Sequence, residues 1–303
     1  MNNISKIIAL TLSTLLLLVA CNKSAPISKE QKNTPEQIIV TTQQYLFEIS
    51  EILLNGTEIK TINLTKNSPE PHDFEPTPSD SALLESSNLI IANSPELEPY
   101  LKNQSSKIFF LSKNVEKPKL EIEHDGITIS DPHFWLDPIL YENISIQIAK
   151  KLSVEFPSKQ ETINKNLASF LEKTNELKSL YESGLKNCKQ KIFFTNHNAF
   201  NYLAKRYNLM NESIHDLSPE HEISLKHLKE VIQEIKSKNI NYILIESNLP
   251  TEIADTIAKE TSAKTMILNP FETLSTNEIS LGKNYFSEMK LNLENLKIAL
   301  SCE

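Results

Sequence analysis

The sequence predicts an α/β protein of two lobes, each a parallel β-sheet with flanking helices, joined by one long backbone helix. The first observation behind this prediction is that short β-rich apolar segments alternate with helical ones, first before residue 112 and again after residue 190. Such alternation is typical of parallel strands connected by crossover helices. The second observation is a central section, from Pro138 to about Lys186, where apolar residues recur only at helical spacing.

The first lobe is expected to hold four strands. Apolar runs bounded by polar residues predict strands at 37–41, 57–64, 88–93 and 107–111, with a helix over 43–55. A proline-rich loop follows the second strand and extends through Pro78. Ser79 and Asp80 are typical of a helix cap, so a helix should begin there and carry the following leucines.

The central section predicts two helices. Apolar residues recur at helical spacing from Ile144 to Leu185, and Pro157 interrupts the stretch. Residues 159–187 should then form a single helix about 40 Å long, at the usual rise per residue. A helix of that length can run past two lobes.

The alternation of strands and helices then resumes in a second lobe. Strands are predicted at 191–195, 241–245 and 264–268, a weaker one at 210–214, and a final helix at 285–300. The expected division is an N-terminal lobe over 37–158, the linking helix over 159–187 and a C-terminal lobe over 188–303. Because ligands of open α/β sheets sit beyond the carboxyl ends of the strands, a binding site is expected in the cleft between the lobes.

The N-terminus has the features of a secretion signal. Lys6 precedes an apolar run, and the run ends in Leu18-Val19-Ala20-Cys21, which resembles a bacterial lipobox. Residues 1–20 would be a lipoprotein signal peptide and Cys21 the lipidated residue, although an ordinary signal peptide with a chance cysteine is the alternative. Polar residues 21–36 would form a flexible tether, and the mature protein would be anchored outside the cytoplasmic membrane, periplasmic or at the cell surface.

Composition excludes several classes of protein. The chain has 303 residues, a net charge of −8 and no basic cluster suited to a phosphate backbone, so no nucleic-acid partner is expected. Four glycines leave no glycine-rich phosphate loop. The apolar run at 7–20 is too short for a membrane-spanning helix of a polytopic protein. We expect a monomer.

Two cysteines remain after Cys21. Cys188 and Cys302 form an even pair in an oxidising compartment, so a disulfide is possible. Two separate thiols remain the alternative.

Three of the seven histidines lie in loops or at a strand end. His72 follows a predicted strand, His133 precedes the helical section, and His197 follows the strand over 191–195. Together they could bind one cation, and neutral imidazole suits zinc, copper or nickel, whereas manganese prefers more oxygen. Each one alone is more simply a structural histidine. His221 and His227 lack the spacing of a zinc-hydrolase motif.

Three segments carry a family resemblance. His72 to Asp80 contains Glu-Pro-Thr-Pro-Ser-Asp, 131–138 reads Asp-Pro-His-Phe-Trp-Leu-Asp-Pro, and 196–207 begins Asn-His-Asn-Ala-Phe. In order and spacing they resemble the metal-binding lipoproteins of zinc and manganese ABC importers, of the high-affinity zinc-uptake type. The resemblance covers essentially the whole mature chain and implies the two-lobed fold predicted above.

The resemblance also implies the metal ligands. His72 and His133 match the two ligands of the N-terminal lobe, and His197 matches the first of the C-terminal lobe, which is Glu in many manganese binders. The fourth family ligand is an Asp after the last strand, and here that place is Asn269. A neutral amide binds zinc less well than a carboxylate, so water or Glu246 could complete the shell. Glu246 could equally support a ligand or be structural.

The function implied is that of an extracytoplasmic solute-binding lipoprotein that captures zinc and delivers it to an ABC permease, with no enzymatic activity. A manganese-specific member of the same family is the first alternative. A zinc hydrolase with three histidines and an open fourth position is another, although no general base accompanies the histidines. A surface adhesin with a structural metal is the last.

Overall fold

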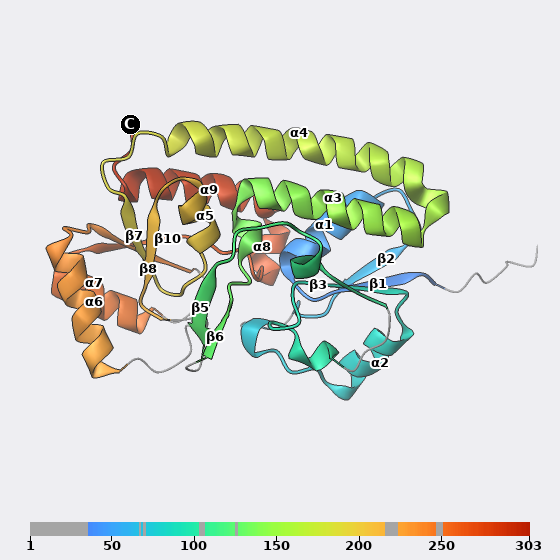
Figure 1. The fold of residues 1–303 in the computed structure, drawn as a ribbon, viewed down its shortest axis with the longest axis horizontal. Coiled ribbons are helices and arrows are strands. Elements are labelled where there is room, and N and C mark those ends of the chain that lie inside the picture. Colours follow the sequence, from blue (N-terminus) through green and yellow to red (C-terminus); the bar gives the residue numbers. More distant parts are fainter. Residues whose placement is uncertain are drawn as a thin grey trace, which may run out of the picture. The chain divides into compact units, whose positions relative to one another are not determined.

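The computed structural model describes residues 36–66, 68, 71–102, 107–124, 127–215, 224–246 and 251–303. The expected signal peptide, Cys21 and all of the tether except Glu36 lie outside these residues. Two four-stranded parallel sheets with flanking helices confirm the predicted fold class (Figure 1). None of the described helices combines the length and the apolar character that crossing a membrane requires.

The sheet of the N-terminal lobe has the strand order β2-β1-β3-β4, with every pair parallel. Its strands are β1 (Ile38–Thr41), β2 (Lys60–Asn63), β3 (Leu89–Ala92) and β4 (Ile108–Phe110). Helix α1 (Gln44–Leu54) connects the first two strands, and α2 (Pro78–Ser86) precedes β3. All four predicted strands of this lobe are therefore present, each somewhat shorter than its apolar run.

The sheet of the C-terminal lobe has the order β10-β9-β7-β8 and is also parallel throughout. Its strands are β7 (Ile192–Thr195), β8 (Met210–Ser213), β9 (Tyr242–Ile245) and β10 (Lys264–Ile267). The helices of this lobe are α5 (Asn201–Arg206), α6 (Leu225–Ser237), α7 (Glu252–Thr261), α8 (Thr276–Ser280) and α9 (Tyr285–Ala299). The weak pattern at 210–214 is thus a genuine edge strand.

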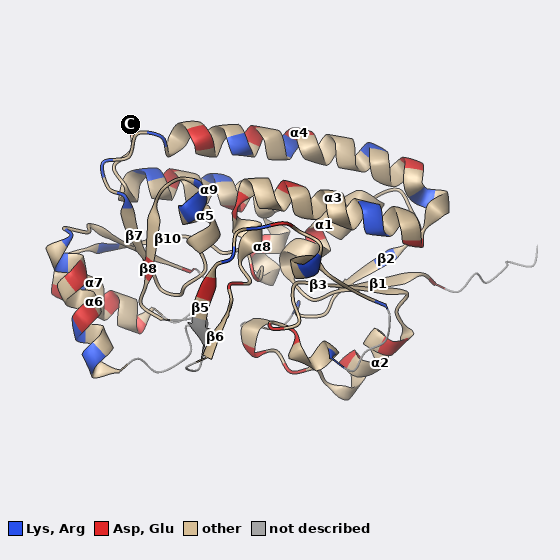
Figure 2. Ribbon diagram, in the orientation of Figure 1, with Lys and Arg blue, Asp and Glu red and all other residues tan. Residues whose placement is uncertain are grey.

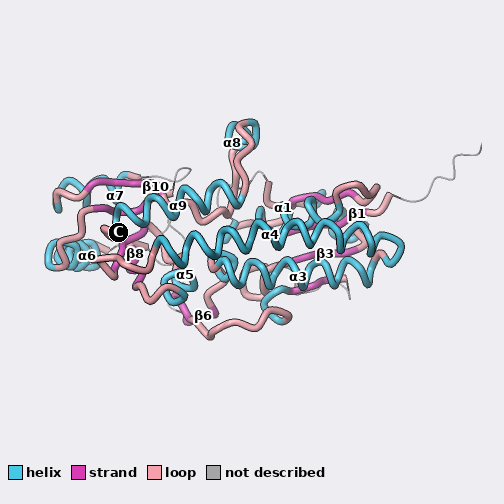
Figure 3. Tube along the Cα trace, turned by 90° about the horizontal axis from the view of Figure 1, so that it is seen from above, coloured by secondary structure: helices cyan, strands magenta, loops and turns pink. Residues whose placement is uncertain are grey.

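Helix α4 (Gln160–Gly184) is the predicted long helix. It has 25 residues, lies beside α3 (Pro138–Glu155) and α9, and extends along both lobes (Figures 1 and 3). Its buried residues, Phe170 and Leu177 among them, face the protein, whereas acidic and basic residues alternate along its exposed surface (Figure 2). The chain turns at Pro157, where the sequence predicted the interruption, because proline cannot continue a helix.

Successive residues along a strand pack into different hydrophobic cores, one on each face of the sheet. Ile39 and Ile91 face a large core that also contains residues of α1, α3, α4 and α9 and of the C-terminal sheet, whereas Val40 and Ile90 face a smaller core under α2. In the C-terminal sheet, Phe194, Ile243 and Ile245 face a third core under α6 and α7. Because side chains alternate along a strand, strands covered on both faces need nearly continuous apolar runs. The large core joins the two lobes.

Two local features differ from the sequence prediction. An antiparallel hairpin, β5 (Glu121–His124) with β6 (Ile127–Ser130), lies in a segment for which no strand was predicted. The cap of α2 is Thr77, not Ser79 and Asp80. The Thr77 side chain accepts from the backbone N–H of Asp80, whose carboxylate accepts from the backbone N–H of Thr77. This reciprocal pair lets Pro78 occupy the first helical position.

A disulfide joins Cys188, which follows α4, to Cys302 at the C-terminus. It closes a loop across a sequence separation of 114 residues, so it should strongly restrict the unfolded chain.

We expect Cys302→Ser to lower the free energy of unfolding by about 2–5 kcal/mol, measured by denaturant titration. A reductant should destabilise the original chain by a similar amount and should leave the variant unaffected. Rapid thiol labelling of both cysteines in the unreduced, folded protein would contradict this prediction.

Candidate metal centre

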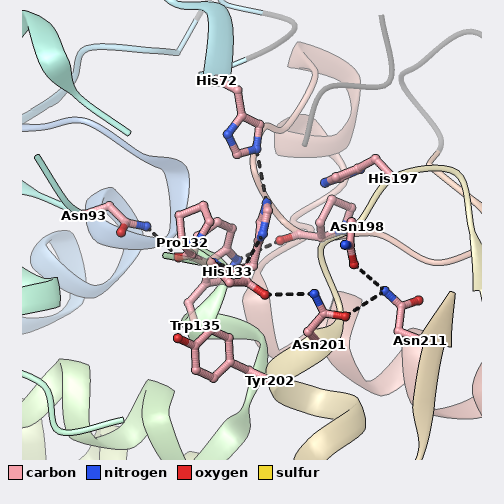
Figure 4. A network of polar contacts seen from close by, with 12 residues as sticks. His72, Asn93, Pro132, His133, Trp135, His197, Asn198, Asn201, Tyr202 and Asn211 are labelled. Atoms are coloured by element: carbon pink, nitrogen blue, oxygen red, sulfur yellow. Dashed lines mark hydrogen bonds and ion pairs between the residues drawn. The ribbon is translucent and has the colours of Figure 1, made fainter. Parts of the chain in front are cut away.

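Four potential ligands converge where the carboxyl ends of both sheets meet. His72 lies in the single 3-10 turn Pro71–Asp73, which follows β2 in the chain, and His133 precedes a second 3-10 turn, Phe134–Leu136. His197 comes two residues after β7, and Glu272 follows β10. One ligand atom from each of these residues lies within 4.8 Å of all the others. Figure 4 shows the three histidines pointing toward one another.

The Glu272 carboxylate is the centre of this cluster. Its Oε1 atom is 3.0 Å from Nε2 of His72, 3.2 Å from Nε2 of His133 and 3.6 Å from Nε2 of His197. The Nε2 atoms of His72 and His133 are 3.2 Å apart. Ligands about 2.0–2.1 Å from a tetrahedral zinc ion stand about 3.3 Å from one another. These four separations are close to the edge length of such a tetrahedron.

The cluster is excluded from solvent. The exposed fraction of the side chain is 1% for His72, 0% for His133, 1% for His197 and 5% for Glu272. The Nε2 atom of His197 is buried and has no hydrogen-bond partner among the described residues. A buried polar atom without a partner is costly, and coordination of a cation would satisfy this one. The donor set of three imidazoles and one carboxylate thus fits a small divalent metal ion.

Carboxylates also contact the far side of two imidazole rings. Nδ1 of His133 is 2.9 Å from Oδ1 of Asp131, and Nδ1 of His197 is hydrogen-bonded to Glu246. The other carboxylate oxygen of Asp131 accepts a hydrogen bond from the side-chain amide of Asn201 in α5, at 3.0 Å. Asp131 therefore connects a ligand on one lobe to a helix of the other.

The imidazoles and carboxylates of the cluster stabilise each other's charged forms. Burial opposes the charged form of His197, but the nearby Glu246 and Glu272 outweigh it and raise the pKa of His197 well above its usual value. The pKa of His133 is also raised, because hydrogen bonds to Asp131 and Glu272 outweigh the effect of burial. Burial alone would raise the pKa of Glu272, yet the charges of His72 and His197 hold it well below its usual value.

Trp135 fixes the two lobes relative to each other next to the ligands. Its indole N–H donates to the carbonyl of Pro270 at 2.8 Å, and its own carbonyl accepts from the hydroxyl of Tyr285 at 2.6 Å. Its ring stacks on Tyr45 with centroids 4.6 Å apart. Trp135 lies two residues after His133 and Pro270 two residues before Glu272, so this contact sets the distance between two ligands.

The three histidines singled out from the sequence are brought together, but the fourth partner differs from both expected residues. Glu272 occupies the place for which Glu246 and Asn269 were considered. Asn269 is directed elsewhere, because its side chain accepts from the backbone N–H of Phe271 and donates to Glu288. Phe271 adopts a left-handed backbone with a φ of 57°, and the resulting turn carries Glu272 into the cleft. The sequence feature that could have indicated this residue is an acidic side chain shortly after the last strand, in Asn269-Pro270-Phe271-Glu272.

The remaining histidines contribute no ligand to this cluster as far as the described residues show. His227 lies in α6 with its side chain 48% exposed, and its Nε2 is 3.2 Å from the carbonyl oxygen of Ile214. His221 and the side chain of His124 lie outside the described part of the chain.

Known proteins are similar to this chain in sequence and fold. The chain is 32% identical over 310 residues to the zinc-binding lipoprotein AdcA of Streptococcus pneumoniae, of which it spans only 60%, while 96% of the chain is covered. It is also 32% identical to the high-affinity zinc uptake system protein ZnuA of Bacillus subtilis, with 94% of each chain covered. The Zn(II)-bound ZnuA-like domain of S. pneumoniae AdcA superimposes with a TM-score of 0.74 at 32% identity, covering 88% of this chain and 99% of that domain.

A family model agrees with these relatives. The model described as zinc-uptake complex component A, periplasmic, matches residues 38–299, which include both sheets, the long helix and all four residues of the cluster. The chain belongs to this family, ZnuA.

Proposed function

We propose that this chain captures zinc outside the cytoplasmic membrane and delivers it to an ABC permease. The observation that carries the proposal is the convergence of His72, His133, His197 and Glu272, whose mutual distances suit one tetrahedral ion. The ion is the cargo of the protein. Lipidation of Cys21 would keep the carrier close to the permease, and residues 21–36 would be its tether.

The donor set favours zinc over manganese. Three imidazole nitrogens and a single carboxylate are a typical zinc set, whereas manganese prefers carboxylates, carbonyls and water. The general affinity order for nitrogen and oxygen sites also places zinc above manganese. A manganese carrier built on this fold would need further oxygen ligands, and the carboxylates of Asp131 and Glu246 face Nδ1 atoms of the histidines.

The geometry argues against the hydrolase alternative. A catalytic zinc site keeps one coordination position open for water. With Glu272 beside all three histidines, the four positions of a tetrahedral ion are filled by protein, and the cluster is closed to solvent. Such a site suits binding and transport.

Removing any one ligand should weaken zinc binding severely. We expect His72→Ala, His133→Ala, His197→Ala and Glu272→Gln each to reduce zinc affinity by at least about 100-fold. This loss should exceed that caused by removing a residue that only hydrogen-bonds to a ligand. Competition against a chelator of known affinity measures this. His227→Ala and Glu260→Gln, on α6 and α7 outside the cluster, are the matched controls and should bind normally. If all four variants still bound one zinc ion tightly, the assignment of the site would be wrong. If the original chain preferred manganese in competition with zinc, manganese and not zinc would be the cargo.

Zinc binding should release protons. The raised pKa values of His133 and His197 keep protons on these rings at pH values above 6.5, the ordinary pKa of histidine. Apparent zinc affinity should therefore rise with pH until both rings are neutral in the metal-free protein, and fall as the pH is lowered. Calorimetric titration in buffers of different ionisation enthalpy measures the proton count. Equal affinities at about pH 6 and about pH 8, with no proton release, would contradict this electrostatic account.

A further inference from the structure

Two of the three histidine ligands share one arrangement, with Nε2 facing the metal position and Nδ1 facing a buried carboxylate. Asp131 holds Nδ1 of His133 and Glu246 holds Nδ1 of His197. The two pairs come from different lobes and from unrelated local structures. Glu246 directly follows β9, whereas Asp131 lies two residues before His133 in a loop.

A neutral imidazole carries one N–H group and one lone pair, on opposite sides of the ring. If Nδ1–H donates to a carboxylate, the lone pair is on Nε2 and can bind the metal. If Nε2 carries the hydrogen instead, the ring cannot coordinate through that atom. The environment of His197 matches the first case, because its Nδ1 meets a carboxylate while no described residue hydrogen-bonds to its buried Nε2.

Glu246 has few other tasks. Only 7% of the residue is exposed, and among the described residues its side chain interacts with His197 alone. Asp131 also accepts a hydrogen bond from the backbone N–H of His133 and another from Asn201, so its loss would disturb the loop and the contact between lobes. Glu246 is therefore the residue whose effect on the metal can be separated from its effect on the fold.

We propose that Glu246 is a positioning residue for metal capture, which orients His197 and keeps the hydrogen on Nδ1 so that Nε2 is ready to bind zinc. This inference rests on the proposed function, because it concerns how a metal ligand is prepared. The carboxylate adds negative charge close to the cation without touching it. It also holds the ring in place before the metal arrives, so less conformational entropy is lost on binding.

The test compares Glu246→Ala with Glu246→Gln in the full-length chain, using zinc as the probe. The alanine variant removes both the acceptor and the charge, and its zinc affinity should fall about 10–100-fold while one zinc ion per chain is still bound. Glutamine retains an acceptor oxygen without the charge, so its loss should be smaller. Glu260→Gln, an exposed acid in α7, is the matched control and should have no effect.

Nitrogen NMR of the imidazole rings gives a readout that a purely structural role would not move. In the metal-free chain above the titration range of His197, its signals should report hydrogen on Nδ1, and the alanine variant should gain the form with hydrogen on Nε2. The thermal midpoint of the metal-free chain checks that each variant folds.

Unchanged zinc affinity and an unchanged His197 signal in folded Glu246→Ala would overturn the proposal, although the proposed function would stand. If Glu246→Ala lost stoichiometric zinc as completely as His197→Ala, Glu246 would be a metal ligand and not a positioning residue, which would also overturn the proposal. Undiminished zinc binding by His197→Ala would instead reject the ligand assignment beneath both proposals.

Discussion

The contact between Trp135 and Pro270 is the constraint on which the binding site depends. A single indole hydrogen bond of 2.8 Å joins the loop that carries His133 to the loop that carries Glu272. The same tryptophan is completely buried between Tyr45 and the hydroxyl of Tyr285, so neither loop can shift without disturbing a large aromatic core. With the core shared by both sheets and the long helix α4 beside it, the ligand distances are set by the packing of whole lobes.

This rigidity explains how charges can be buried here. Glu272, Glu246 and Asp131 would each be costly inside a protein without a partner. Each instead faces one or more imidazoles, and the raised pKa values of His133 and His197 express the same balance from the other side. In the proposed function, a divalent cation would take over this balance from protons, and the shared core would keep the two lobes in place.

Much of this arrangement could be predicted from the sequence, because it depends on local patterns. The apolar runs located every strand of both parallel sheets. The segments around His72, His133 and His197 implied three members of the cluster through their resemblance to a known family, whereas the positions of the histidines alone were a weak signal. The fourth was missed because the left-handed turn at Phe271 is not visible as a pattern, and because the Asp position of the family was matched to Asn269. The β5–β6 hairpin was missed because β6 is mostly exposed and neither short strand contains a continuous apolar run.

The most direct test of the account is anomalous diffraction at the zinc edge from crystals of the zinc-loaded chain. The account predicts one zinc ion bound by Nε2 of His72, His133 and His197 and by a carboxylate oxygen of Glu272, each about 2.0–2.2 Å away. It also predicts that Glu246 remains hydrogen-bonded to Nδ1 of His197. A zinc ion located elsewhere, or one bound by Glu246 or Asn269 in place of Glu272, would contradict it.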